Sequence, residues 1–112
     1  MKRGDIWWAS SENPRGSEPG YRRPVLIVQA NAFNESRIST VLVAVISSNL
    51  ALAEAPGNVR ISKADSKLSK ASVVNVSQLL TLDRQYLSRR VSRLPSRAMI
   101  RVTDGLRLVL GL

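Results

Sequence analysis

Two adjacent arginines, Arg22 and Arg23, stand just before an apolar run that has the length of a β-strand, residues 25–28. The run is continuous rather than alternating, which is typical of a strand covered on both faces. Such a strand would hold the Arg23 guanidinium rigidly at the floor of a loop-covered cleft, where it could bind a phosphate or stabilise charge developing on one. Alternatively, Arg23 caps the strand edge and pairs with Glu12 or Glu18. Since side chains alternate along a strand, we expect Arg22 to be the surface member of the pair.

Three further polar residues fall on strand-like segments: Ser47, Asn75 and Gln78. The Ser47 hydroxyl can bond to nearby backbone at the end of its strand, or it can donate a hydrogen bond to a phosphate. A serine nucleophile needs an adjacent base, and the sequence contains no histidine, so we expect no serine-hydrolase chemistry. Asn75 and Gln78 would either form cross-strand hydrogen bonds or recognise the bases of a nucleic acid.

Two other features of the sequence carry weaker signals. Trp7 and Trp8 are adjacent, so one should face the core and the other the opposite face of a strand. A base-stacking platform is one interpretation, but we favour packing in the core or at a subunit interface. Arginines also recur at positions 89, 90, 93, 97, 101 and 107. We interpret most of this basic tract as solvated helix surface and assign no site to it.

The amino-acid composition removes several classes of chemistry. The 112 residues include neither cysteine nor histidine, which excludes disulfides, a thiolate nucleophile, a histidine acid or base and the usual zinc ligands. The 8 acidic residues are scattered without metal-loop spacing, so we expect no metal and no cofactor. No apolar run approaches the ~18–20 residues of a membrane span, and the N-terminus lacks a signal peptide's apolar stretch. We therefore expect a cytoplasmic protein with no membrane partner.

The net charge of +9 is the strongest signal in the composition, with 17 Lys and Arg against 8 acidic residues. A basic surface can serve solubility alone, but a charge of this size favours a polyanionic partner, most often nucleic acid. Thirteen of the cations are arginine, which binds phosphate in a bidentate manner and stacks on bases. The balance therefore favours a nucleic-acid partner.

Hydrophobic patterning predicts one domain, residues 1–112, built mainly from short strands. The expected strands lie at residues 4–9, 25–29, 40–46, 58–61, 72–80 and 91–94. Residues 10–22 contain two prolines and two glycines and are expected to form a long loop.

Two helices are expected after the strands. Asp83 can cap a helix over residues 83–90, because its carboxylate can accept from the free amides of the first turn. Residues 96–112 have apolar positions at spacings of three and four, which predicts an amphipathic helix. Gly105 lies inside it and costs about 1 kcal/mol relative to alanine, so packing must hold this helix. The combination predicts a small antiparallel β-barrel or curved sheet with helices attached.

Six segments occur in a characteristic order along the chain: RGDIWWA, GSEPGYRRPVLIVQANAFN, STVLVAVISSNL, PGNV, SVVNVSQLLTLD and GLRLVLGL. In this order, from Arg3 to Leu112, they resemble the MazF/PemK family, the ribonuclease toxins of bacterial toxin–antitoxin pairs. The resemblance implies a mainly β fold, an SH3-like barrel with short helices and a C-terminal helix, assembled as a homodimer. It also implies sequence-selective cleavage of single-stranded RNA such as mRNA without a metal ion. The RNA's 2′-hydroxyl attacks the adjacent phosphate and leaves 2′,3′-cyclic phosphate and 5′-hydroxyl ends.

The resemblance also implies roles for single residues. Arg23 corresponds to the family's catalytic arginine, and Ser47 to its catalytic hydroxyl residue, which is commonly threonine. Because arginine is a poor base, we assign Arg23 chiefly electrostatic stabilisation, with proton donation as a second role that stays open. We assign Ser47 a hydrogen bond to phosphate. The residues expected to contact RNA are Glu18, Arg22, Asn75 and Gln78. An acidic, partly disordered cognate antitoxin is expected to block RNA by occupying the same groove.

The chain departs from the family pattern at two positions, and two other functions remain open. Asn31 and Ala71 stand where many members have aspartate, which leaves open whether an acidic residue takes part in catalysis. A gyrase-binding toxin of the same barrel type, similar to CcdB, would act through its terminal helix. A non-catalytic RNA-binding barrel would need only the positive charge. Arg23 and Ser47 together argue against the first of these, and RNA cleavage distinguishes the nuclease from both.

Overall fold

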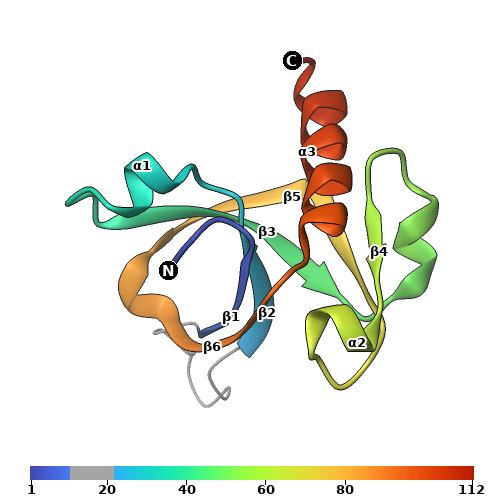
Figure 1. The fold of residues 1–112 in the computed structure, drawn as a ribbon, viewed down its shortest axis with the longest axis horizontal. Coiled ribbons are helices and arrows are strands. Elements are labelled where there is room, and N and C mark those ends of the chain that lie inside the picture. The colour runs from blue at the N-terminus through green and yellow to red at the C-terminus, as the bar shows by residue number, and fades with distance from the viewer. Residues whose placement is uncertain (11–21) are drawn as a thin grey trace, which may run out of the picture.

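A curled antiparallel sheet with one long helix against it forms the body of the protein, in a computed structural model that describes residues 1–10 and 22–112 (Figure 1). The strand order in this sheet is β4-β5-β3-β2-β1-β6. The strands are β1 (Asp5–Ser10), β2 (Arg22–Ile27), β3 (Thr40–Ser47), β4 (Val59–Ile61), β5 (Ser72–Asp83) and β6 (Leu87–Arg93). The helices are α1 (Asn31–Asn34), α2 (Lys63–Ser66) and α3 (Ser96–Leu110), with 3₁₀ turns η1 (Leu50–Glu54) and η2 (Arg84–Tyr86). The predicted mainly β fold with a C-terminal helix is confirmed.

The prediction of a helix over residues 83–90 is wrong. Asp83 does cap a turn, since its carboxylate accepts from the Gln85 amide at 3.2 Å, but only Arg84–Tyr86 form that single 3₁₀ turn. The chain then enters β6, which pairs with β1 and satisfies its backbone groups there. Tertiary pairing therefore overrides the local helical preference, and the strand expected at 91–94 begins at Leu87 instead.

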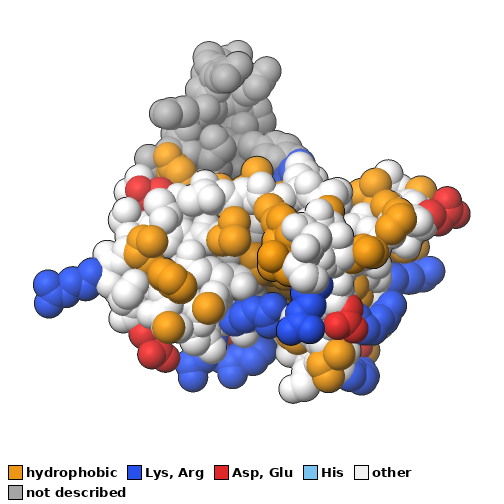
Figure 2. Space-filling view, turned by 90° about the horizontal axis from the view of Figure 1, so that it is seen from above, with side chains coloured by type: hydrophobic (Ala, Val, Ile, Leu, Met, Phe, Trp, Pro, Cys, Tyr) orange, Lys and Arg blue, Asp and Glu red, His pale blue; other side chains and the backbone are white. Residues whose placement is uncertain are grey.

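The basic tract is accordingly divided between two elements. Arginines 89, 90 and 93 lie on β6, whereas 97, 101 and 107 lie on α3. The interpretation as helix surface is wrong for the first three, because β6 is a strand. Figure 2 shows Lys and Arg side chains spread over much of one face of the molecule, with fewer acidic side chains between them.

Strand β2 begins three residues earlier than expected, at Arg22. Alternate residues of this strand enter two different core clusters: Val25 and Ile27 join one, and Leu26 and Val28 beyond it join the other. The apolar run is therefore covered on both faces, as its continuity indicates. Both arginines belong to the strand itself rather than to the loop that precedes it.

Helix α3 packs against β4 and β5 (Figure 1). Gly105 sits at the point of contact, where a Cβ atom would overlap the carbonyl oxygen of Gly57 and lie 2.9 Å from its carbonyl carbon. Gly57 itself has φ +86°, which favours glycine. The close approach of two backbones thus explains why the helix contains a glycine. No helix in the described part of the chain is long and apolar enough to cross a membrane.

The buried carboxylate of Asp5, on β1, forms ion pairs with two arginines of the neighbouring edge strand β6. It lies 3.0 Å from Arg93 Nε and 3.5 Å from Arg90 Nε, and it accepts from the Lys2 amide at 2.9 Å. Burial alone would raise the pKa of this carboxyl, but the hydrogen bonds from Arg93 and Lys2 and the charge of Arg90 outweigh burial and lower the pKa below its ordinary value. The ionised form therefore stabilises the fold.

Replacing Gly105 with alanine tests the contact between α3 and the Gly57 turn. We expect Gly105→Ala to lower the free energy of unfolding by about 2–3 kcal/mol, because backbone must move to admit the methyl group. Arg107→Ala, at an exposed position of the same helix, should change it by less than about 0.5 kcal/mol. Urea unfolding measures both changes, and a Gly105→Ala protein as stable as Arg107→Ala would contradict this account of the contact.

The Asp5 cluster predicts a specific loss of stability in acid. Since the folded-state pKa is lowered, the carboxylate's contribution is complete above the unfolded value of about 3.9 and disappears as the pH falls through the folded-state pKa. Asp5→Asn should cost about 2 kcal/mol at neutral pH and should show a shallower decline in acid than the wild type. Urea unfolding across the acid range measures this. Asp104→Asn is the matched control at an exposed position, and parallel pH profiles for Asp5→Asn and wild type would rule the prediction out.

Candidate functional site

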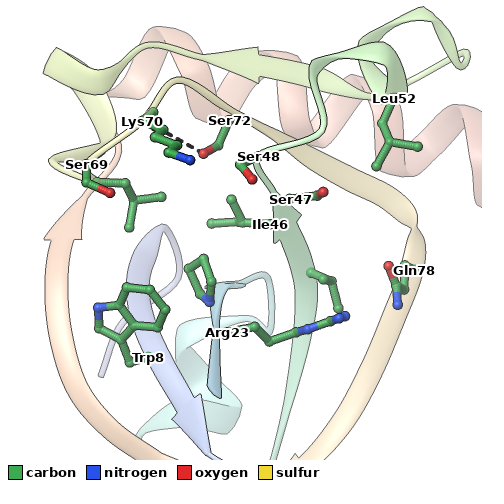
Figure 3. Close-up of a pocket in the computed structure, with 13 residues that line it drawn as sticks. Trp8, Arg23, Ile46, Ser47, Ser48, Leu52, Ser69, Lys70, Ser72 and Gln78 are labelled. Atoms are coloured by element: carbon green, nitrogen blue, oxygen red, sulfur yellow. Dashed lines mark hydrogen bonds between the residues drawn. The ribbon is translucent and has the colours of Figure 1, made fainter. Parts of the chain in front are cut away.

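A cavity of about 460 Å³ opens where the start of β2, the end of β3 and a bulge in β5 meet (Figure 3). Its polar lining includes Arg23, Ser47, Ser48, Ser69, Lys70 and Gln78. The described lining contains two cationic side chains and no acidic one. Such a surface favours an anionic ligand.

The pairing of β2 with β3 brings Arg23 and Ser47 together. Val25 lies opposite Val45 in this antiparallel pair, and the same register continued two residues further brings Arg23 beside Ser47. Both residues are half-buried and line the cavity. Figure 3 shows the Arg23 side chain extending past β3 toward Gln78. The two predicted catalytic residues therefore share one site although 23 positions separate them in sequence.

The Ser47 hydroxyl oxygen accepts a hydrogen bond from the Asn49 amide at 3.1 Å. This is the local backbone role that strand-terminating serines often have. Accepting this bond fixes the position of the oxygen while the hydroxyl proton can still be donated. The backbone role and a role toward a phosphate are thus compatible.

A bulge in β5 presents Gln78 to the cavity. Ala44 pairs with Leu79 whereas Val45 pairs with Asn75, so the residues between them, 76–78, have no partner on β3. Gln78 lines the cavity. Asn75 instead shapes the bulge, since its side-chain oxygen accepts from the Ser77 amide at 3.2 Å and from the Ser77 hydroxyl at 2.7 Å. The structure places Gln78, but not Asn75, in the described lining.

Asn58, which no sequence pattern singled out, also holds the bulge. Its side-chain oxygen accepts from the buried Val76 amide at 2.9 Å, and its side-chain nitrogen donates to the Leu52 carbonyl at 2.9 Å. Leu52 also lines the cavity. One amide side chain therefore connects two of the cavity walls.

Arg22 and Trp8 form a stacked pair at the edge of the site. The Arg22 guanidinium lies 4.9 Å from the centre of the Trp8 ring, which is within the range of a cation–π contact. Arg22 is exposed, as expected for the surface member of the pair. Trp8 both packs against the core and lines the cavity, while Trp7 packs on the other core cluster. The two tryptophans thus face opposite sides of β1.

The remaining predicted residues lie elsewhere. Glu18 lies outside the described residues, as does most of the loop expected over 10–22. Asn31 lies at a separate cavity beside α3, where its side-chain oxygen accepts from the Arg3 amide at 2.7 Å. Ala71 adjoins Lys70 at the start of β5. Neither Asn31 nor Ala71 is in the described lining of the first cavity.

Lys70, Ser69 and Ser48 also line the cavity, although no sequence pattern pointed to them. Lys70 and Ser69 lie in the turn between α2 and β5, in a polar stretch without a recognisable motif. Only the folded sheet brings that turn near β2. Across the described residues, no group of three or more Asp or Glu side chains is arranged to hold a metal ion.

Comparisons with known proteins bear on this site. Residues 2–110 match the sequence model of a family described as PemK-like, MazF-like toxin of type II toxin–antitoxin system. Endoribonuclease MazF6 of Mycobacterium tuberculosis is 46% identical over 112 residues, which cover 100% of this chain and 98% of that protein. Endoribonuclease MazF of Staphylococcus saprophyticus is 37% identical over 100% of this chain and 92% of its own length.

Solved structures share the fold at lower sequence identity. An endoribonuclease in complex with its cognate antitoxin, from a Mycobacterial species, has a TM-score of 0.82 at 21% identity and covers 100% of this chain and 96% of its own. The Mycobacterium tuberculosis toxin MazF-mt6 has a TM-score of 0.78 at 19% identity, over 96% and 97% of the two chains. These similarities support the curled sheet and its terminal helix as a common architecture.

Asn58 variants test how the bulge is held. Asn58→Ala leaves the buried Val76 amide without its acceptor, so we expect the free energy of unfolding to fall by about 1–3 kcal/mol and the Val76 amide to exchange faster with solvent. Asn58→Asp keeps an acceptor for Val76 but cannot donate to Leu52, so its Val76 amide should stay protected. Hydrogen exchange measured by NMR distinguishes the two variants, and unchanged protection in Asn58→Ala would show that another group holds the bulge.

Proposed function

The chain belongs to the PemK-like, MazF-like toxin family of type II toxin–antitoxin systems, and we propose that it cleaves single-stranded RNA without a metal ion through Arg23 and Ser47. Endoribonuclease activity follows from relatives of that name, which match the whole chain at up to 46% identity. The observation that carries the assignment of residues is the shared cavity of Arg23, Ser47 and Gln78, whose described lining is cationic. The gyrase-binding alternative is not retained, because the relatives are endoribonucleases.

The proposed reaction exchanges one phosphodiester bond for another. The 2′-oxygen of the RNA forms a bond to phosphorus while the bond to the 5′-oxygen breaks. The 2′-hydroxyl loses its proton to solvent, the 5′-oxygen gains one, and the products carry 2′,3′-cyclic phosphate and 5′-hydroxyl ends. Because the substrate supplies the nucleophile, a chain without cysteine and histidine can perform this reaction.

Arg23 and Ser47 act on the charge that develops at phosphorus. The crowded intermediate has more negative charge on its non-bridging oxygens than the starting phosphate, so a cation held in place lowers its free energy more than that of the substrate. β2 fixes the backbone that bears Arg23, and the Asn49 amide orients the Ser47 oxygen. The Ser47 hydroxyl keeps its proton and donates a hydrogen bond to a non-bridging oxygen.

The neighbouring polar groups bind the nucleotides around the cut. Gln78, on the β5 bulge, can hydrogen-bond a base edge. Arg22 and Trp8 offer a stacked surface for a base next to the cleavage site. Asn75 stabilises this bulge and stays a predicted RNA contact itself. Glu18, in the loop outside the described residues, stays a predicted RNA contact.

An acidic antitoxin is the regulatory partner in this proposal. A solved structure of the same fold is described as an endoribonuclease in complex with its cognate antitoxin. With a net charge of +9, this chain would attract an acidic antitoxin segment, and such a segment in the cavity would exclude RNA. The proposal also includes a homodimer and a cytoplasmic location, where single-stranded mRNA is accessible.

RNA cleavage in EDTA tests the proposed function. We expect purified protein to cut a long single-stranded RNA at discrete positions and to leave cyclic phosphate ends. Arg23→Ala should lower the rate by about 10²–10³-fold, and Ser47→Ala should lower it less, because each removes stabilisation of the developing charge. End mapping and single-turnover rates measure these effects.

Two controls make the result specific. Arg37→Ala removes an exposed arginine outside the cavity and should cleave at the wild-type rate, and unfolding midpoints should show that all variants are folded. Arg23→Lys keeps the charge but not the bidentate geometry, and its rate should fall between those of Arg23→Ala and wild type. Full activity of a folded Arg23→Ala protein would disprove the assignment.

A further inference from the structure

We propose that Lys70 binds a second phosphate of the RNA, adjacent to the scissile one, so that the RNA backbone crosses the cavity from Arg23 to Lys70. This inference rests on the proposed function. It adds a substrate contact that neither the family resemblance nor the sequence pattern assigns. Lys70 lies in the turn between α2 and β5, on a different wall from Arg23 (Figure 3).

Buried hydroxyl groups fix the main chain of this turn. The Ser72 hydroxyl donates to the Lys70 carbonyl at 3.1 Å. Ser66, fully buried, accepts from the Leu68 amide at 3.1 Å through its hydroxyl, and its carbonyl accepts from the buried Ser92 hydroxyl at 2.5 Å. Burying hydroxyls is unfavourable unless they are hydrogen-bonded, and here each bond restrains the turn. The backbone that bears Lys70 is therefore held on both sides.

The charge of Lys70 is available to a ligand. The side chain is exposed, and none of the three ion pairs found among residues 1–10 and 22–112 includes it. The described lining has no carboxylate to neutralise it. A lysine ammonium acts as a point charge toward phosphate oxygens from any direction. The second wall of the cavity is thus a cationic position that no carboxylate of residues 1–10 and 22–112 pairs with.

Hydroxyl groups complete an anion site around this cation. Figure 3 shows the Lys70 amine directed toward the side of the cavity occupied by Ser48 and Ser72, with Ser69 next to it in the turn. Ser48 and Ser69 are exposed and line the cavity. Each hydroxyl can donate one hydrogen bond to a phosphate oxygen. A phosphate beside Lys70 would therefore have donors of two kinds.

The connectivity of RNA makes the bound group a neighbouring phosphate. A single phosphate at Arg23 and Ser47 leaves Lys70, on another wall, without a role. Consecutive phosphates are separated by one nucleoside, and a cavity of about 460 Å³ is within the usual range for one bound small molecule. A nucleoside in the cavity, with its two phosphates at Arg23 and Lys70, uses both cations.

A thermodynamic cycle between lysine and phosphate tests this contact. The substrate is a short RNA that contains a cleavage site mapped with the wild type, made with an uncharged methylphosphonate at one position at a time. Binding is measured with a 2′-deoxy nucleotide at the cleavage site, which prevents reaction, and cleavage is measured with the ribose form. The proteins are wild type, Lys70→Gln, Lys70→Arg and the matched control Lys63→Gln, an exposed lysine of α2 outside the cavity.

We expect Lys70→Gln to weaken RNA binding about 5–10-fold, to raise KM by the same factor and to leave kcat within about twofold, because the contact is made equally in the ground and transition states. The slope of log affinity against log salt should fall by about 0.7, the value for one contact to single-stranded nucleic acid. Lys70→Arg should restore most of the affinity, and Lys63→Gln should match the wild type.

The methylphosphonate scan identifies the phosphate. A methylphosphonate at one position beside the scissile phosphate should weaken binding to the wild type but not to Lys70→Gln. This result would show that the lysine substitution and the phosphate substitution remove the same contact. Additive effects at every position would overturn the inference, as would coupling at the scissile phosphate alone or a fall in kcat without a change in KM. Since the wild type must cleave the unmodified RNA before the scan begins, failure of the proposed function is detected separately.

Discussion

The register of β3 between its two neighbours is the constraint on which the cavity depends. Alternate residues of this strand are buried on opposite faces of the sheet: Val41 and Val43 enter one cluster, and Ala44 and Ile46 enter the other. A slip of one residue would exchange these faces, and both faces are apolar, so burial alone does not forbid it. The register is set by the neighbouring strands, because Val45 lies opposite Val25 of β2 on one side and opposite Asn75 of β5 on the other.

This register brings Arg23 of β2 near Ser47 of β3. If β3 were shifted by one residue, the two side chains would not meet.

The bulge in β5 is the point where regular pairing gives way to a binding surface. Three residues without partners on β3 would leave backbone groups unsatisfied, and two asparagines supply the missing bonds. Asn58 accepts from the Val76 amide, and Asn75 accepts from Ser77. The bulge thereby places Gln78 at the cavity, while Val76 stays fully buried. Asn75 thus supports the bulge that carries Gln78, and both residues stay predicted RNA contacts.

The ion pairs among the described residues and the large cavity lie in different parts of the structure. Asp5 uses its buried carboxylate to join Arg90 and Arg93, which ties β6 to β1. Asp65 pairs with Arg97 at 2.6 Å and connects α2 to α3. The acidic side chains of these pairs lie outside the lining of the large cavity, where Arg23 and Lys70 are found. Two carboxylates, Asp5 and Asp65, thus hold elements together, and the described lining of the cavity contains cations without a carboxylate.

The sequence by itself determined the type of protein and the residues expected at its site. Strand-length apolar runs, a terminal amphipathic pattern and the order of the family segments predicted the mainly β fold, and the same segments identified Arg23, Ser47 and Gln78, which the structure brings to one cavity. These features are local, so periodicity and motif can detect them.

Only the tertiary structure decided how the rest of the chain serves that cavity. Residues 87–93 became a strand because β1 offered backbone partners that a local pattern cannot include. Glycine has a low helix propensity, yet it is required at position 105 because the Gly57 backbone lies against it and leaves no room for a Cβ atom. Lys70 and Asn58 joined the site from a polar stretch distant in sequence, since antiparallel pairing and a bulge, rather than spacing along the chain, set which side chains meet.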